Sequence, residues 1–295
     1  MTATSTAADR PPRAGLLHRS PRLRVGLLLT PPMLWLGVAY LGALAALFIT
    51  AFWGQNSFTG TVERTWTLGN FRDLLTIDVY RTVTARTIGI AALVTVLDAV
   101  IAFPVALFMA KVASPRTQRA LVVALLMPLW ASYLVKAYAW RGMLGTGGLV
   151  SWVASPFGLD TPGFGITGLI ITLAYLWLPY MVLPIYAGLE RLPTSLLEAS
   201  ADLGARSGTT LRRVVLPVAF PAIVAGSVFT FSLTMGDYIA VRIVGGPNQM
   251  LGNVVFDNVG AANNLPFAAA VATIPVVVML VYLALVRRTG ALENL

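Results

Sequence analysis

Long apolar stretches separated by short polar segments dominate the chain from residue 27 onward. Six of them are long enough for a helix to cross the hydrocarbon core of a bilayer, which takes about 20 apolar residues. We therefore predict an all-α membrane protein with six transmembrane helices in a membrane domain at 25–290, between tails at 1–24 and 291–295. The predicted spans are 27–53, 87–110, 120–140, 166–189, 218–243 and 267–286.

Composition supports this class and removes several others. The chain is 57% hydrophobic with a mean hydropathy of +0.77, which is too apolar for a soluble domain of this size. It has no cysteine, and its one histidine, His18, lies in the polar tail. A disulfide framework, a cysteine nucleophile, a Cys/His zinc site and a histidine triad within the membrane are therefore excluded.

No nucleotide-binding loop is present in the sequence. Lysine occurs only at Lys111 and Lys136, and neither belongs to a G-x-x-x-x-G-K-[ST] phosphate loop. We expect no cofactor on this chain. Any ATP and Mg²⁺ that are used must be bound by another chain.

The basic residues give a topology signal. The net charge is +9, but the basic residues are dispersed at the ends of apolar segments, which does not suit a nucleic-acid surface. With six spans and the N-terminus inside, 14 of the 21 basic residues fall on the inner side, as the positive-inside rule requires. Both termini and the loop at 190–217 are thus predicted to be cytoplasmic, with 141–165 outside. The outer seven are Arg64, Arg72, Arg81, Arg86, Lys136, Arg141 and Arg242.

The loop at 190–217 has the signals of a short helix. Pro193 lies at the entry, Ser195 and Glu198 match an S-x-x-E capping box, and Gly204 supplies a stop after two to three turns. Residues four and seven positions apart on a helix face the same way, so a small stripe should lie beside an acidic pair. The stripe is Leu197, Ala201 and Gly204, and the pair is Glu198 and Asp202.

This loop resembles the cytoplasmic loop of the permease subunits of bacterial ABC importers. That pattern reads E-A-A, three residues, Gly, nine residues, Ile, one residue, Leu-Pro; here Ser200 replaces the second Ala and Val214 replaces Ile. The resemblance implies a coupling helix that docks on a separate ATPase subunit. The alternative is a capped surface helix whose glutamate satisfies its own backbone. The implied coupling residues are Glu198, Ala199, Ser200, Asp202, Gly204, Leu216 and Pro217.

Two carboxylates fall inside predicted spans, Asp98 in the second and Asp237 in the outward half of the fifth. An ionised Asp at the centre of a span costs about 2.5–3.5 kcal/mol on insertion scales, so it normally faces a pathway or a partner. The structural alternatives are a hydrogen bond to a neighbouring helix, pairing with Lys136, or protonation. Asp237 is followed by Tyr238, whereas Asp98 has only Thr95 at a useful spacing on its own helix.

Aromatic residues are concentrated on the third and fourth predicted spans. Such residues serve either as an interfacial belt and packing or as faces that bind a cation. The group comprises Tyr133, Tyr138, Trp140, Tyr175, Trp177 and Tyr180. The residues predicted to line a substrate path are Asp98, Asp237, Tyr238, Tyr175 and Trp177.

Further segments are similar to the spermidine/putrescine branch of these permeases, although the same motifs occur in iron and other branches. They are LPYMVLP at 178–184, FPVA at 103–106, GDY at 236–238, GGP at 245–247, MLGN at 250–253 and LPFAAA at 265–270. The resemblance implies a type I ABC importer permease fold in a bacterial plasma (inner) membrane. It also implies ATPase subunits, a second, homologous permease chain and an external solute-binding protein as partners.

The sequence thus predicts a transport subunit, not an enzyme, for polyamines or a similar small cationic solute. Iron(III) and amino-acid derivatives are the alternative solutes. An ion-coupled secondary transporter would use Asp98 and Asp237 as ion sites, but the coupling-like loop argues against it. An intramembrane enzyme would find little catalytic material, since the spans lack His, Cys and a cluster of carboxylates.

Overall fold

The computed structural model describes residues 21–56, 58–158 and 161–288. Most of the tail at 1–24 and all of the tail at 291–295 therefore lie outside the described residues. The chain divides into two units, one up to Thr50 and one from Ala51 onward. The first unit is a run of helix made of α2 (Pro21–Leu36), the π-helical turn η1 (Gly37–Leu41) and α3 (Gly42–Thr50). Within it, Val25–Thr50 is long and apolar enough to span a membrane, which confirms the first expected span.

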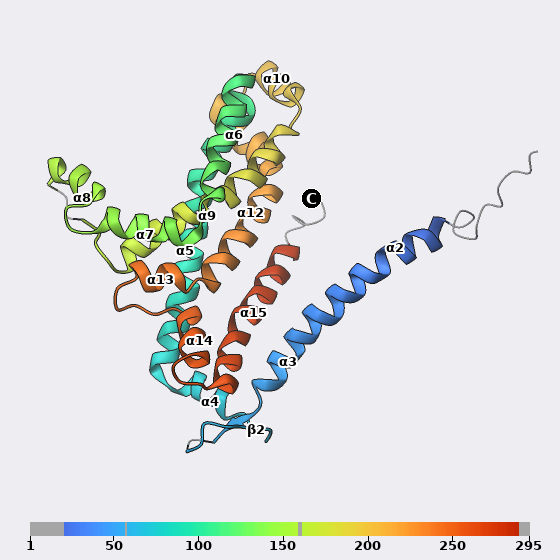
Figure 1. The fold of residues 1–295 in the computed structure, drawn as a ribbon. Coiled ribbons are helices and arrows are strands. Elements are labelled where there is room, and N and C mark those ends of the chain that lie inside the picture. The colour runs from blue at the N-terminus through green and yellow to red at the C-terminus, as the bar shows by residue number, and fades with distance from the viewer. Residues whose placement is uncertain (1–20, 57, 159–160, 289–295) are drawn as a thin grey trace, which may run out of the picture. The chain divides into compact units, whose positions relative to one another are not determined.

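The second unit begins with a small antiparallel hairpin and continues as a bundle of helices (Figure 1). In the hairpin, Gly54 pairs with Glu63 and Gln55 with Val62. The strands are β1 (Gly54–Gln55) and β2 (Val62–Glu63). The helices are α4 (Gly69–Thr76), α5 (Asp78–Lys111), α6 (Pro115–Trp130), α7 (Tyr133–Leu144), α8 (Leu149–Ala154), η2 (Ser155–Phe157), α9 (Ile166–Glu190), α10 (Thr194–Asp202), α11 (Ser207–Thr210), η3 (Leu211–Val215), α12 (Leu216–Gly236), α13 (Ile239–Val244), α14 (Leu251–Val259) and α15 (Leu265–Arg288).

Four expected spans of this unit correspond, in whole or in large part, to long apolar helical runs. They run over Asp78–Lys111, Ile166–Glu190, Ser207–Gly236 and Leu265–Arg287. The first of these begins nine residues before the expected position 87, because its early turns carry the exposed ion pair of Asp78 with Arg81 and so are polar. Hydropathy alone leaves such turns out of a span.

The third expected span, 120–140, is wrong as a continuous helix. Instead α6 and α7 meet at a bend of 96°. Ala131 and Ser132 are extended at the break, with ψ of 141° and 138°. Pro128 lies in the last turn of α6 and removes one helical hydrogen bond there, which weakens the helix just before it ends. The pair makes the sixth span only if both helices are counted together.

The fifth expected span, 218–243, is wrong over its last seven residues. Helix α12 ends at Gly236, and Asp237 follows in an extended conformation with ψ of 129°. The chain then starts a separate short helix, α13. Asp237 therefore lies at the end of a span rather than inside one.

Helices α5, α9 and α12 pack against one another and form the centre of the bundle, with α10 at one end and α4 at the other (Figure 1). Small side chains allow close approach, which is the usual basis of helix packing in membranes. Gly226 of α12 lies against Met181 of α9, and Gly188 of α9 against Ala222 of α12. On α5, Ala102 and Ala106 are fully buried in a hydrophobic cluster that also contains Met181 of α9.

Candidate functional site

Helix α10 forms where the loop pattern predicts it, but it begins differently. Pro193 occupies the N-cap position, and no side chain caps the helix. Ser195 is therefore already the second helical residue, so the predicted capping box with Glu198 is wrong. The stop at Gly204 is confirmed: its φ is +74°, a conformation that favours glycine.

The end of α10 is closed by two backbone hydrogen bonds of the Schellman type. The N–H of Gly204 donates to the carbonyl of Ala201 at 2.8 Å, and that of Ala205 donates to the carbonyl of Ser200 at 3.1 Å. The Ser200 hydroxyl also lies 2.8 Å from that of Thr210, which ties α10 to α11. The loop is thus a defined structure with a fixed end.

The three residues of the predicted stripe on α10 do not share one environment. Leu197 packs toward the cluster formed by α5 and α9, whereas Ala201 and Gly204 are exposed. Three more of the predicted coupling residues on α10 are exposed: Glu198, Ala199 and Asp202. Leu216 and Pro217, at the start of α12, are exposed as well. A Cβ at Gly204 would meet nothing within 4 Å, so this face is open in the described chain.

Asp237 is buried, with 6% of its surface exposed, and both carboxylate oxygens are engaged. Its Oδ1 accepts a hydrogen bond of 2.9 Å from the backbone N–H of Ala240, in the first turn of α13. Its Oδ2 accepts a hydrogen bond from the Tyr133 hydroxyl, which links Asp237 to α7. The expected alternative of a hydrogen bond to a neighbouring helix is confirmed. Among the described residues, Asp237 makes no ion pair with Lys136.

A cavity of about 310 Å³ lies at this carboxylate. The Tyr133 and Trp177 rings stack there with centroids 5.8 Å apart, and Tyr180 lies 5.9 Å from Trp177. The Trp177 Nε1 is buried and has no hydrogen-bond partner in the described structure. A carboxylate beside aromatic faces provides the two features that attract a cation. The lining residues are Tyr133, Trp177, Ser232, Leu233, Gly236, Asp237, Tyr238 and Ile239.

Tyr238 is held in place from the α14 side. Its ring stacks on Phe256 at 4.9 Å, and the Arg242 guanidinium lies 4.5 Å from the centre of the Phe256 ring. Arg242 also pairs with Asp257 at 3.2 Å. The Asn253 amide donates to the Tyr238 carbonyl at 3.1 Å. This wall of the cavity is therefore positioned by contacts that continue well beyond the cavity.

The structure brings together only part of the predicted path. Asp237, Tyr238 and Trp177 line one cavity, but Tyr175 does not and packs on Trp140 at 5.3 Å.

Asp98 is fully buried on α5, and neither of its oxygens has a hydrogen-bond partner in the described structure. Thr95 does not satisfy it, because its hydroxyl donates to the Ala91 carbonyl. Asp98 is not among the residues that line the Asp237 cavity.

Sequence reasoning placed Tyr133 in the aromatic group but not among the residues of the predicted path. Its hydrogen bond to Asp237 depends on the bend that separates α7 from α6. The signal for that bend was Pro128 followed by polar Ser132 within an apolar stretch. Ser232, Leu233 and Ile239 line the cavity and carried no signal in the sequence. Among the described residues there is no group of three or more His, Cys, Asp or Glu side chains that could hold a metal ion.

Comparison with known proteins gives consistent matches. Residues 24–290 match the family described as "Binding-protein-dependent transport system inner membrane component". The chain is 41% identical to the inner membrane ABC transporter permease protein YdcU of Escherichia coli K12, over 96% of this chain and 95% of that protein. It is 33% identical to the spermidine/putrescine transport system permease protein PotB of the same organism, over 79% of this chain and 86% of that protein.

The fold is also found among solved structures. A chain of a bacterial alginate ABC transporter, crystallised with an alginate pentasaccharide-bound periplasmic protein, matches with a TM-score of 0.75 at 16% identity. The match covers 95% of this chain and 98% of that one. At this identity the likeness shows the fold, which is that of an ABC transporter permease. With a family match over nearly its whole length, the chain belongs to the inner membrane permease components of binding-protein-dependent transport systems.

Proposed function

We propose that this permease imports polyamines or a similar small cationic solute. The observation that carries the proposal is the buried carboxylate of Asp237 in a cavity walled by the stacked rings of Tyr133 and Trp177. The PotB relative, a spermidine/putrescine permease by name, supports the same solute class.

The physical reason lies in the loss of water by the solute. An ammonium group entering a low-dielectric passage loses hydration, and a fixed carboxylate or aromatic face offsets that loss. The Asp237 carboxylate is held at the cavity by hydrogen bonds from the Tyr133 hydroxyl and the Ala240 backbone N–H. A cation that enters the cavity therefore meets a carboxylate whose position is fixed.

The proposal includes the partners that such an importer needs. ATP and Mg²⁺ are bound by separate ATPase subunits, on which the exposed face of α10 docks. A second, homologous permease completes the membrane part, and an external binding protein delivers the solute on the opposite side. Both termini and residues 190–217 then face the cytoplasm, in line with the distribution of basic residues.

Uptake of labelled spermidine, normalised to the amount of assembled complex, tests the solute site. We expect Asp237→Asn to slow uptake more than it lowers abundance, because it removes the charge and keeps the shape. Tyr133→Phe is the matched variant, since it keeps the ring and removes only the hydroxyl that donates to Asp237. It should retain more uptake than Asp237→Asn.

Two results would count against the proposal. Unchanged uptake in Asp237→Asn removes this carboxylate from the path. If spermidine and putrescine, presented with the binding protein, fail to stimulate ATP hydrolysis by the reconstituted complex, polyamines are not the solute and the permease assignment stands.

A further inference from the structure

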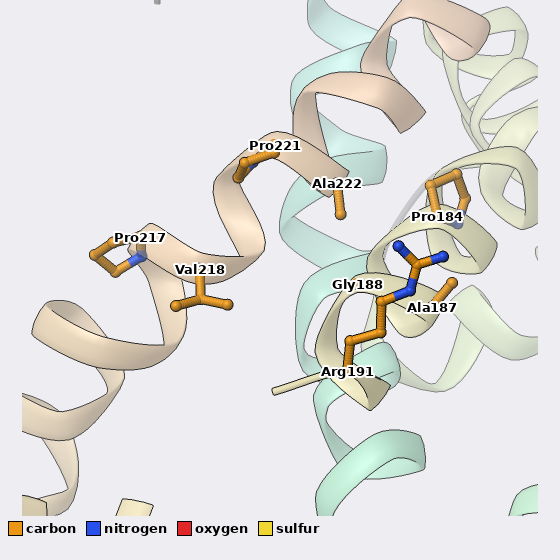
Figure 2. Close-up of a pocket in the computed structure, with 8 residues that line it drawn as sticks. All are labelled: Pro184, Ala187, Gly188, Arg191, Pro217, Val218, Pro221 and Ala222. Atoms are coloured by element: carbon orange, nitrogen blue, oxygen red, sulfur yellow. The ribbon is translucent and has the colours of Figure 1, made fainter. Parts of the chain in front are cut away.

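A cavity of about 470 Å³ lies between α9 and α12 (Figure 2). Its lining residues belong to the end of α9 and the start of α12, which flank the loop that carries α10. It is separate from the Asp237 cavity and shares no lining residue with it. Its walls are apolar apart from one side chain, that of Arg191. The apolar wall includes Pro184 and Ala187 from α9 and Pro217, Val218 and Pro221 from α12.

The cavity exists because the two helices touch and then diverge. A Cβ on Gly188 would lie 2.6 Å from the Ala222 Cβ, so the backbones are in close contact there. From this contact toward the loop, α12 turns away from α9, and Pro217 and Pro221 lie on the diverging part (Figure 2). Proline weakens the helical hydrogen-bond ladder and permits such a bend. A wedge-shaped space is left beside the coupling loop.

Arg191 points its guanidinium into this space (Figure 2). Its side chain makes no hydrogen bond or ion pair with any described residue. Neighbouring polar groups are already engaged: the Lys111 ammonium donates to the Leu192 carbonyl at 2.7 Å, and Glu190 accepts from Tyr186 at 3.2 Å. The cavity therefore holds one unpaired positive charge.

The chemistry of the cavity selects an amphiphilic anion. Guanidinium binds phosphate or carboxylate through paired hydrogen bonds, and it disfavours an ammonium group, so the space is not an extension of the proposed solute site. The apolar wall continues onto exposed side chains of α12, where Leu216 is 41% exposed and Val218 and Phe220 are each 43% exposed. Basic pockets between membrane helices bind anionic lipid head groups.

We propose that the α9–α12 cavity is a binding site for an anionic phospholipid. Arg191 holds the phosphate, and the acyl chains lie along the prolines and the exposed apolar side chains of α12. Because α9 and α12 enter and leave the loop that carries α10, the lipid keeps these two helices apart beside the coupling helix. This site does not depend on which solute the permease carries.

Native mass spectrometry of the purified complex with added phosphatidylglycerol, against phosphatidylcholine, tests the proposal. We expect Arg191→Gln to retain phosphatidylglycerol about fivefold less than the parent, the effect of one basic charge near an anionic lipid. Ala187→Phe fills the cavity with the charge intact and should also reduce retention. Arg206→Gln is the control, because Arg206 is exposed on the same loop and does not line the cavity. Arg191→Lys should restore part of the binding.

Equal retention of phosphatidylglycerol by the parent and Arg191→Gln would overturn the proposal. So would an equal loss in Arg191→Gln and Arg206→Gln, since it would show general surface charge. If Arg191→Gln instead loses a partner subunit while lipid retention is unchanged, the guanidinium meets a protein carboxylate and the lipid site is refuted.

Discussion

Asp237 and Asp98 are both buried, but their oxygen atoms have different surroundings. Asp237 accepts hydrogen bonds from Tyr133 and Ala240 and faces a cavity. Asp98 is 0% exposed and has no hydrogen-bond partner in the described structure. A hydrogen bond from Asp98 to a neighbouring helix was one alternative that the sequence left open, and no described residue supplies that bond. A buried polar group without a partner costs about 1–3 kcal/mol of stability.

We expect Asp98→Val to raise the stability of the purified protein, because it replaces an unpartnered buried polar group with an apolar one. Asp237→Val should lower it, since Tyr133 and Ala240 lose their acceptor. For Asp98→Val, the free energy of unfolding should rise by about 1–3 kcal/mol. Thermal unfolding in detergent measures both variants side by side. Earlier unfolding of Asp98→Val would show that this carboxylate has a partner in the assembled protein.

At the scale of elements, the contact between α9 and α12 depends on glycine. A Cβ at Gly226 would lie 2.7 Å from the Met181 sulfur and 3.1 Å from its carbonyl oxygen. The sulfur is at the end of a flexible side chain and can move, but the backbone of α9 cannot move without disturbing the core. The size of residue 226 therefore sets how closely the two helices approach.

Gly226→Ala should destabilise the protein by about 1–3 kcal/mol, the usual effect of overpacking. Gly89→Ala is the matched control, because it lies on α5 with nothing within 4 Å of the added Cβ. Fluorescence-detected size-exclusion chromatography after heating compares the two. Similar behaviour of both variants would mean that α9 shifts freely.

Gly204→Asp should abolish transport while the subunit stays in the membrane. The residue has φ of +74°, so any side chain is strained there, and the exposed face it belongs to is the proposed docking face for the ATPase. Co-purification of the ATPase with the variant, together with solute-stimulated ATP hydrolysis, is the measurement. Normal assembly and transport would show that α10 is not a coupling helix.

The sequence predicted the long elements well and the interruptions poorly. Hydropathy located the spans of α5, α9 and α15 because each is apolar for well over a helix-spanning length. It could not locate the break at Ala131 or the end of α12 at Gly236, because apolar residues continue on both sides of each. Both interruptions are set by the backbone conformation, which hydropathy does not reveal. The partnership of Tyr133 with Asp237 was hidden for the same reason.

The helix in the loop at 190–217 was predicted from residue spacing, but the S-x-x-E pattern misplaced its start. Pro193 precedes the first helical residue and has a fixed φ that suits the N-cap geometry, so the helix starts before Ser195 can cap it. The closing turn at Gly204 was predictable because few residues other than glycine adopt that conformation.

For the molecule as a whole, the sidedness of the membrane is the main prediction. The absence of cysteine makes single-cysteine labelling clean. Ser207 and Ser155 are both exposed, the first at the start of α11 and the second in η2. In intact cells, we expect an impermeant thiol reagent to label Ser155→Cys and to leave Ser207→Cys unlabelled until the membrane is opened. Labelling of Ser207→Cys in intact cells would invert the proposed topology.

The helical run from Ser207 to Gly236 has a mechanical consequence. It contains 30 residues, starts in the loop that carries α10 and ends one residue before Asp237. Its prolines, Pro217 and Pro221, lie near the loop, so the 15 residues at 222–236 form an uninterrupted arm of about 22 Å. Pivoting this arm by about 10° at the prolines moves its far end by about 4 Å. A small rotation at the loop is thereby converted into a displacement of atomic size at Asp237, through one backbone and without a relay of side chains.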